Sequence, residues 1–151
     1  MSKLPTLEQI MRPASLISQD AFIKEAVTMM NKEKANELLV IDNEGILVGE
    51  VSVTDILGAA VPEDFDGDNV VQHFADEDAF RTSIKNIADK FVSDCMSYSV
   101  ESVRADASLL DVAATAIAMG QARIPVVDHD NRPVGIISRQ GLKQILTQYL
   151  N

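Results

Sequence analysis

Hydrophobic and polar positions follow the same order twice along this chain. In the first copy, apolar residues at helical spacing run through residues 21–34, and two short apolar runs follow at 38–41 and 48–52. The same three segments return in the second copy, at residues 107–119, 124–127 and 134–138. Helical spacing predicts an amphipathic helix, and a short unbroken apolar run predicts a strand buried on both faces. The pattern therefore predicts two helix–strand–strand units.

The two copies align without a gap over the forty positions from Ser18 to Leu57, at an offset of 86 residues. The identical pairs fall on turns and strand ends: Asp20/Asp106, Ala21/Ala107, Val40/Val126, Asp42/Asp128, Val48/Val134, Gly49/Gly135 and Ser52/Ser138. A repeat sets the architecture of a chain. Because there are only two copies, we expect a pseudo-symmetric pair rather than a solenoid.

Polar residues predict where the helices of each copy begin and end. Asp20 and Asp106 precede the first helices, where a carboxylate can accept from free backbone N–H groups as an N-cap. Gly120 is placed to end the second of these helices. Thr54 and Asp55 are expected to cap a short helix that reaches Ala60, and residues 140–149 predict its counterpart.

These elements predict an α/β (α+β) protein. Neither copy has enough strands to bury both faces alone, so we expect two pseudo-symmetric repeats packed through their sheets, with two equivalent clefts between them. The expected boundaries are residues 1–61 for the first repeat, 62–79 for an acidic linker loop, and 80–151 for a helix followed by the second repeat. Apolar residues three to four apart from Phe80 to Phe91 predict that helix.

Composition and charge narrow the function. The chain has 151 residues and a net charge of −10, and seven of its acidic residues lie between Pro62 and Asp78. No cluster of lysine and arginine is present, so binding to nucleic acid or to an anionic membrane is not expected. Cys95 is the single cysteine, which excludes an internal disulfide. With no apolar run of signal-peptide or membrane-spanning length, we expect a cytoplasmic protein.

The sequence shows no arrangement typical of catalysis or of a metal site. No Ser–His–Asp set, carboxylate pair or glycine-rich phosphate loop is present, so we do not expect an enzyme. The acidic segment Asp64–Asn69 departs from the calcium-loop pattern, because its glycine is misplaced and no glutamate follows at the twelfth position. His73 and His129 are far apart and without metal-ligand spacing. We expect no bound metal.

Several motifs recur in a fixed order in both halves. Met11 and Met96 lie in short lead-ins before each copy, and the strand of each copy ends in aspartate, as Leu38–Asp42 and Arg123–Asp128. The next strand continues into a helix through Gly49-Glu50-Val51-Ser52-Val53-Thr54-Asp55, which has the form Gly-x-apolar-Ser/Thr-x-x-Asp. This doubled set resembles a tandem pair of cystathionine-β-synthase-type (CBS) domains, called a Bateman module.

The resemblance implies a fold and a ligand class. Each repeat would have the order β-α-β-β-α, and the pair would be a regulatory module that binds an adenosine-containing ligand such as AMP, ADP or ATP in the clefts. It also implies a homodimer, with a separate protein as a possible target. The alternative is a degenerate pair that serves only protein association or dimerisation, without a ligand.

The candidate site residues of the first repeat are Asp55, Ser52, Thr54 and Ile17. A carboxylate at the start of a helix can accept from both vicinal hydroxyls of a ribose, and the serine hydroxyl can bond sugar or phosphate. Capping of the helix is the alternative for Asp55 and Ser52. Ile17 and its counterpart Val103 match the adenine-side segment of the resembled family, and a plain core role is the alternative for both.

The second repeat departs from the motif, since Gly141 stands where the first repeat has Asp55. It keeps Ser138 and gains Arg139, whose planar guanidinium suits phosphate. Arg123 can line a cleft or form a salt bridge, and Arg139 can equally be an exposed surface residue. We therefore expect one competent nucleoside site, on the first repeat.

Overall fold

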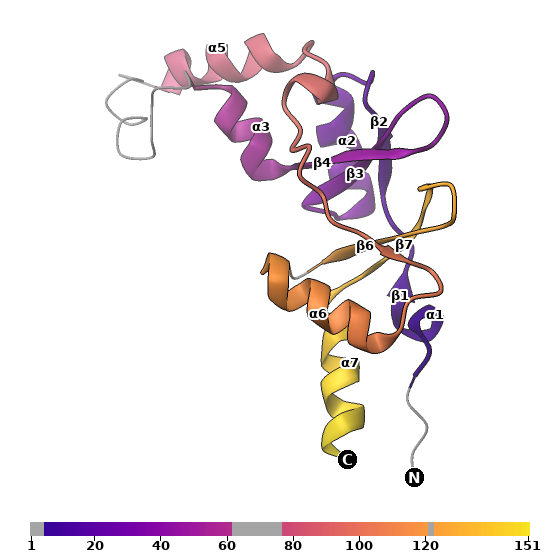
Figure 1. Ribbon diagram of the computed structural model, residues 1–151. Helices are drawn as coiled ribbons and strands as arrows, with labels where there is room; N and C mark the ends of the chain where they lie inside the picture. Colours follow the sequence, from indigo (N-terminus) through magenta and orange to yellow (C-terminus); the bar gives the residue numbers. More distant parts are fainter. Residues whose placement is uncertain (1–4, 62–76, 121–122) are drawn as a thin grey trace. The chain divides into compact units, whose positions relative to one another are not determined.

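The computed structural model describes residues 5–61, 77–120 and 123–151, which group into two units with a sheet and a core each (Figure 1). The repeat-1 unit consists of Ser15–Asp42 and Val48–Tyr98. The repeat-2 unit consists of Met1–Ala14, Asn43–Leu47 and Ser99–Asn151. The acidic segment Asp64–Asn69 lies outside the described residues. No helix in the described part of the chain is both long and apolar enough to span a bilayer.

The repeat-1 unit has a three-stranded sheet in the order β2-β3-β4. Its elements are β2 (Leu16–Ser18), α2 (Ile23–Glu33), β3 (Glu37–Ile41), β4 (Leu47–Ser52), α3 (Val53–Ala59), α5 (Glu77–Ile87) and the 3-10 helix η1 (Val92–Asp94). Strand β2 pairs parallel with β3, and Ile17 lies opposite Val40.

The repeat-2 unit has a four-stranded sheet in the order β1-β7-β6-β5. Its elements are α1 (Leu7–Ile10), β1 (Met11–Arg12), β5 (Val103–Arg104), α6 (Leu109–Met119), β6 (Ile124–Val127), β7 (Pro133–Ile137) and α7 (Arg139–Leu150). Strand β5 pairs parallel with β6, which pairs antiparallel with β7. Each copy therefore has the order β-α-β-β-α, and the α/β fold class is confirmed.

Backbone geometry repeats at the same offset as the sequence. Lys34 and Gly120, each just after the long helix of its copy, both have left-handed backbone, with φ of 55° and 61°. Gly45 and Asn131, in the turns between the paired strands, also have positive φ, at 83° and 62°. A left-handed residue ends a helix or turns a hairpin at low cost when it is glycine or asparagine. The two copies thus share turn conformations even where the residue type differs.

The predicted helix starts need correction. Asp20 and Asp106 do not cap α2 and α6, because each lies in a turn before the helix. The N-cap of α6 is Ser108, whose hydroxyl accepts from the Asp111 backbone N–H at 3.1 Å, while Asp111 Oδ2 accepts from the Ser108 N–H at 3.1 Å. The N-cap of α2 is Phe22, whose N–H donates to Glu25 at 2.7 Å. Each helix therefore begins two residues later than predicted, at Ile23 and Leu109.

Each core is completed by the lead-in that precedes the other copy in sequence. Leu7 and Ile10, from the start of the chain, are buried with Val126 and Ile137 in the repeat-2 unit. The corresponding core of the repeat-1 unit takes Ile87, Val92 and Met96 from the segment that leads into the second copy. Neither feature follows from sequence order, because a lead-in could equally pack on its own copy.

Both lead-ins cross a glycine in the neighbouring strand. A Cβ on Gly49 would lie 2.6 Å from the Ser97 carbonyl oxygen and 2.8 Å from Met96 Sδ. A Cβ on Gly135 would lie 2.7 Å from Met11 Sδ and 2.8 Å from the Arg12 carbonyl oxygen. Real Cβ atoms do not approach other atoms so closely. The identical glycines of the two copies are thus explained by the close approach of a lead-in.

We expect Gly49→Ala and Gly135→Ala each to lower the free energy of unfolding by about 1–3 kcal/mol, because the added methyl group overpacks the strand against a backbone carbonyl. Urea denaturation measures the change. Gly58→Ala is the control, since nothing lies within 4 Å of its added Cβ, and alanine in a helix is favoured over glycine by about 0.5–1 kcal/mol. Equal urea-denaturation midpoints for the three variants would refute the explanation that a lead-in crowds the two strand glycines.

Candidate functional site

The start of α3 holds Ser52 and Asp55 in a reciprocal capping arrangement. The Ser52 backbone N–H donates to Asp55 Oδ2 at 2.9 Å, and the Asp55 N–H donates to Ser52 Oγ at 3.1 Å. The junction is further fixed because the Val53 N–H donates to the Asn36 carbonyl at 3.0 Å. The cap of α3 is therefore Ser52, with Asp55 in its first turn, rather than the predicted pair of Thr54 and Asp55.

This arrangement orients the Asp55 carboxylate and leaves part of it available. The side chain is half-buried, and within residues 5–61, 77–120 and 123–151 its Oδ1 has no hydrogen-bond partner. Thr54 is exposed in the same turn.

Burial raises the pKa of the nearby Cys95 thiol, and the negative charges of Asp94 and Asp55 raise that pKa further, against the opposing charge of Lys90. Asp55 is thus a fixed anion beside a half-buried thiol.

The equivalent position of the second copy has no room for a side chain. Ser138 caps α7, where its Oγ accepts weakly from the Gly141 N–H at 3.5 Å. Gly141 is buried, and a Cβ there would lie 2.9 Å from the Ile10 carbonyl oxygen and 3.1 Å from Ile137 Cγ2. Helix α1 packs against α7 at this point. The packing of α1 therefore excludes a carboxylate side chain at this position.

The remaining predicted residues of the second copy lie at one end of its sheet. Ile124 and Ile137 are register partners, so Arg123, just before β6, and Ser138, just after β7, are placed at the same end. Arg139 is the exposed first residue of α7, and Arg123 is half-buried. The structure thus groups the three polar candidates Arg123, Ser138 and Arg139 within the repeat-2 unit.

Ile17 and Val103 lie in the two cores. Each side chain is only 6% exposed, with Ile17 in β2 and Val103 in β5. Their side chains are therefore surrounded by protein in both units. A role for either residue toward a ligand would have to use backbone atoms, and it stays a prediction.

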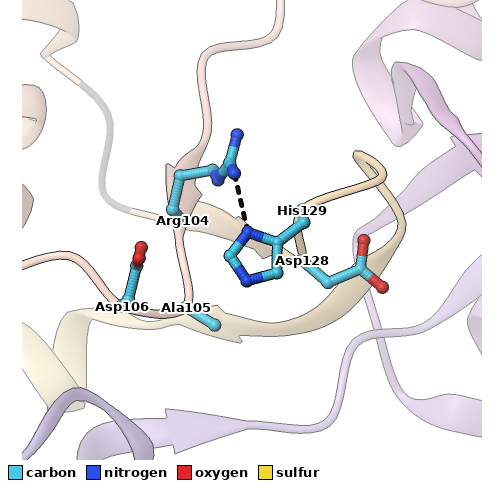
Figure 2. A pocket seen from close by; sticks show the side chains of 5 residues that line it. All are labelled: Arg104, Ala105, Asp106, Asp128 and His129. Carbon is cyan, nitrogen blue, oxygen red and sulfur yellow. Dashed lines mark hydrogen bonds between the residues drawn. The ribbon is translucent and has the colours of Figure 1, made fainter.

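Sequence reasoning missed a pocket at the opposite end of the repeat-2 sheet, where β5 and β6 end (Figure 2). The cavity measures about 250 Å³ and is lined by Arg104, Ala105, Asp106, Asp128 and His129. Arg104 Nη2 lies 2.8 Å from His129 Nδ1. Because arginine keeps its protons, the histidine nitrogen is the acceptor, and the ring proton is on Nε2.

The two aspartates of this pocket have different roles. Asp128 Oδ1 accepts from the backbone N–H groups of Asp130 at 2.9 Å and Arg132 at 3.0 Å. The Arg132 backbone bond is the largest cause that lowers the pKa of Asp128 below its ordinary value, although burial acts against it. Asp128 thus stabilises the turn. One sequence signal could have indicated the pocket: Arg104 and His129 replace the uncharged Ser18 and Asn43 of the first copy.

Comparison with known proteins identifies the repeats. The CBS domain family profile matches residues 7–62 and 92–147. An uncharacterized protein of Methanocaldococcus jannaschii is 24% identical over 93% of this chain and 90% of its own length. The glycine betaine/carnitine/choline transport ATP-binding protein OpuCA of Bacillus subtilis is 27% identical over 93% of this chain. This chain spans only 30% of that transporter protein.

Solved structures show the same fold. The CBS-pair protein CBSX2 from Arabidopsis thaliana superposes with a TM-score of 0.72 at 25% identity, over 99% of both chains. A structure of CBSX2 in complex with AMP gives a TM-score of 0.68 at 26% identity, over 97% of this chain and 98% of that one. These neighbours are similar along nearly their full length, so the likeness covers both repeats.

We expect Gly141→Ala to lower the free energy of unfolding by about 1–3 kcal/mol, since the Cβ would displace the Ile10 backbone. Gly141→Asp is expected to destabilise the protein further, because it adds a buried charge at the same crowded point. Urea denaturation of both variants measures this. Gln140→Ala, at the exposed neighbour, should change stability by less than about 0.5 kcal/mol. A Gly141→Ala protein as stable as this control would disprove the packing explanation.

Proposed function

This chain belongs to the CBS-domain family, and we propose that it is a regulatory, non-catalytic module that binds an adenosine-containing ligand such as AMP, ADP or ATP. The proposal places the nucleoside at the junction of β4 and α3, with Asp55 as the ribose acceptor. The observation that carries it is the fixed, half-buried Asp55 carboxylate, whose Oδ1 accepts no hydrogen bond from the described part of the chain. The AMP complex of CBSX2 supports the choice of ligand class.

The chemistry at Asp55 suits a ribose. A carboxylate can accept from two vicinal hydroxyl groups, and hydrogen bonds to a charged acceptor contribute about 1.5–3 kcal/mol each. The reciprocal bond to the Ser52 N–H holds the carboxylate in place before binding, which lowers the entropy lost when a ligand is bound. The exposed Thr54 hydroxyl and Ser52 Oγ are further polar groups at the same helix start.

The second repeat contributes differently under this proposal. It offers no carboxylate at Gly141, so we assign one ribose site to each chain. The donors of Arg123, Ser138 and Arg139 suit phosphate oxygens, and their role in phosphate binding stays a prediction. Ligand binding would regulate by shifting the equilibrium between packing states of the protein, to the extent that the ligand prefers one state.

Asp55→Ala is expected to weaken the binding of AMP, ADP or ATP by about tenfold or more, because the variant loses charge-assisted bonds to the ribose. Isothermal titration calorimetry of the purified chain with each nucleotide, and with S-adenosylmethionine, measures affinity and stoichiometry. One ligand per chain is expected.

The matched control is Asp111→Ala. Asp111 has the same reciprocal capping geometry at the start of α6, with both bonds at 3.1 Å, so both variants lose a capping bond but only one loses the proposed ribose acceptor. Wild-type affinity in Asp55→Ala would remove Asp55 from the site. If no adenosine compound at millimolar concentration raises the melting temperature, the protein is not a nucleotide sensor.

A second candidate function, association with another copy, is favoured by exposed apolar residues on two helices of the repeat-2 unit. On α6, Leu110 is 74% exposed and Ile117 is 83% exposed, one heptad apart. On α7, the apolar residues Leu146, Tyr149 and Leu150 are exposed, at positions i, i+3 and i+4. Apolar residues at i, i+3, i+4 and i+7 form a stripe that a partner helix can cover. We therefore propose that α6 and α7 form a homodimer interface.

Ile117→Lys is expected to shift the protein from dimer to monomer, because the interface would bury an unpaired charge. Sedimentation velocity over a range of concentrations measures the shift. Val134→Lys, a change of similar size at a 44% exposed strand residue of the same unit, should leave the dimer intact. Wild-type protein that sediments as a monomer at all concentrations would rule out this interface.

A further inference from the structure

The pocket at the ends of β5 and β6 is built from two kinds of residue. Asp106 and Asp128 are identical to Asp20 and Asp42 of the first copy, so they belong to the shared framework of the repeat. Arg104 and His129 occur only in the second copy. Because the two repeats have the same fold, a function that only the second copy has is expected to come from residues that only this copy has.

Arg104 and His129 hold each other in a defined orientation. Arg104 Nη2 donates to His129 Nδ1 at 2.8 Å, and the other guanidinium N–H groups and His129 Nε2–H remain as donors. Figure 2 shows the Asp106 and Arg104 side chains on one side of the His129 ring, and the Asp128 carboxylate pointing away from both. The solvent-exposed residues Arg104 and Asp106 therefore contribute one oriented cation and one carboxylate to the lining of the cavity.

Charge selects among the small molecules that could enter. A simple anion would gain from Arg104, but it would meet the Asp106 carboxylate and the field of a protein with a net charge of −10. A simple cation would meet the guanidinium. A molecule with separated positive and negative ends matches both groups and has no net charge. The arginine fork binds carboxylate through two parallel N–H···O bonds, and an ammonium group can donate to Asp106.

The volume of the cavity also favours a small ligand. The cavity of about 250 Å³ is smaller than the roughly 300–1,000 Å³ of pockets for drug-sized ligands. We propose that this pocket is a second ligand site that binds a free α-amino acid, with its carboxylate on Arg104 and its ammonium on Asp106. His129 positions the guanidinium. The site is separate from the nucleoside site proposed at Asp55.

The test titrates the purified chain with each proteinogenic amino acid, and calorimetry or saturation-transfer NMR measures the binding. Glycine, acetate, methylammonium and trimethylglycine serve as probes of the two ends. At least one amino acid is expected to bind saturably. Acetate and methylammonium should bind at least about tenfold more weakly, since each lacks one charge-assisted contact. Trimethylglycine should also bind more weakly than glycine, because its nitrogen carries no N–H donor.

Arg104→Gln and Asp106→Asn should each weaken amino acid binding by about tenfold or more. Arg81→Gln, a change at an arginine on α5 with a 63% exposed side chain, is the matched control and should bind as the wild type does. Asp55→Ala should leave amino acid binding unchanged, so failure at this pocket is distinguishable from failure at the nucleoside site. A urea-denaturation midpoint of Arg104→Gln equal to that of the wild type shows that this variant is folded.

Two results would overturn the proposal. The first is the absence of saturable binding by any amino acid at millimolar concentration. The second is acetate binding as tight as that of the amino acids and sensitive to Arg104→Gln alone, since the pocket would then be an anion site.

Discussion

The close approach of a lead-in to a strand glycine is the constraint on which the rest of this structure depends. The Ser97 N–H donates to the Glu50 carbonyl at 2.8 Å, and Arg12 is the antiparallel register partner of Ile136. Each lead-in brings a methionine over the glycine and apolar residues into the core. A side chain at either glycine would separate the lead-in from its strand. The packing of each core therefore depends on the absence of a Cβ atom at its strand glycine.

The same constraint explains why the two repeats differ at the candidate site. The lead-in that packs on the second copy forms α1, and the Ile10 carbonyl oxygen occupies the space beside Gly141. The lead-in that packs on the first copy forms the 3-10 helix η1 and continues through Cys95, and Asp55 is half-buried in that copy. The two lead-ins are one residue out of register. A small difference in the path of the backbone thus decides which copy can present a carboxylate.

The sequence was sufficient for the fold class and the order of the main elements, because the repeated strand runs and turn residues have local causes. The strand Ile124–Val127 was predicted with its observed bounds, and Gly120 ends α6 in the left-handed conformation. The helix starts predicted from Asp20 and Asp106 were two residues too early, because the N-caps are instead Phe22 and Ser108. The Arg104–His129 pair joins residues 25 positions apart, and the Ile10–Gly141 contact joins residues even further apart. Such contacts depend on tertiary packing, which residue patterns do not encode.

The crossed lead-ins also determine how the chain can be divided. A cut at the sequence boundary between the copies would leave Leu7 and Ile10 on one fragment and the interior that they fill on the other. The reverse holds for Val92 and Met96. Each fragment would contain a lead-in without the core on which it packs, and its own core would lack the apolar residues of the other lead-in. The smallest fragment able to fold independently therefore does not coincide with one repeat.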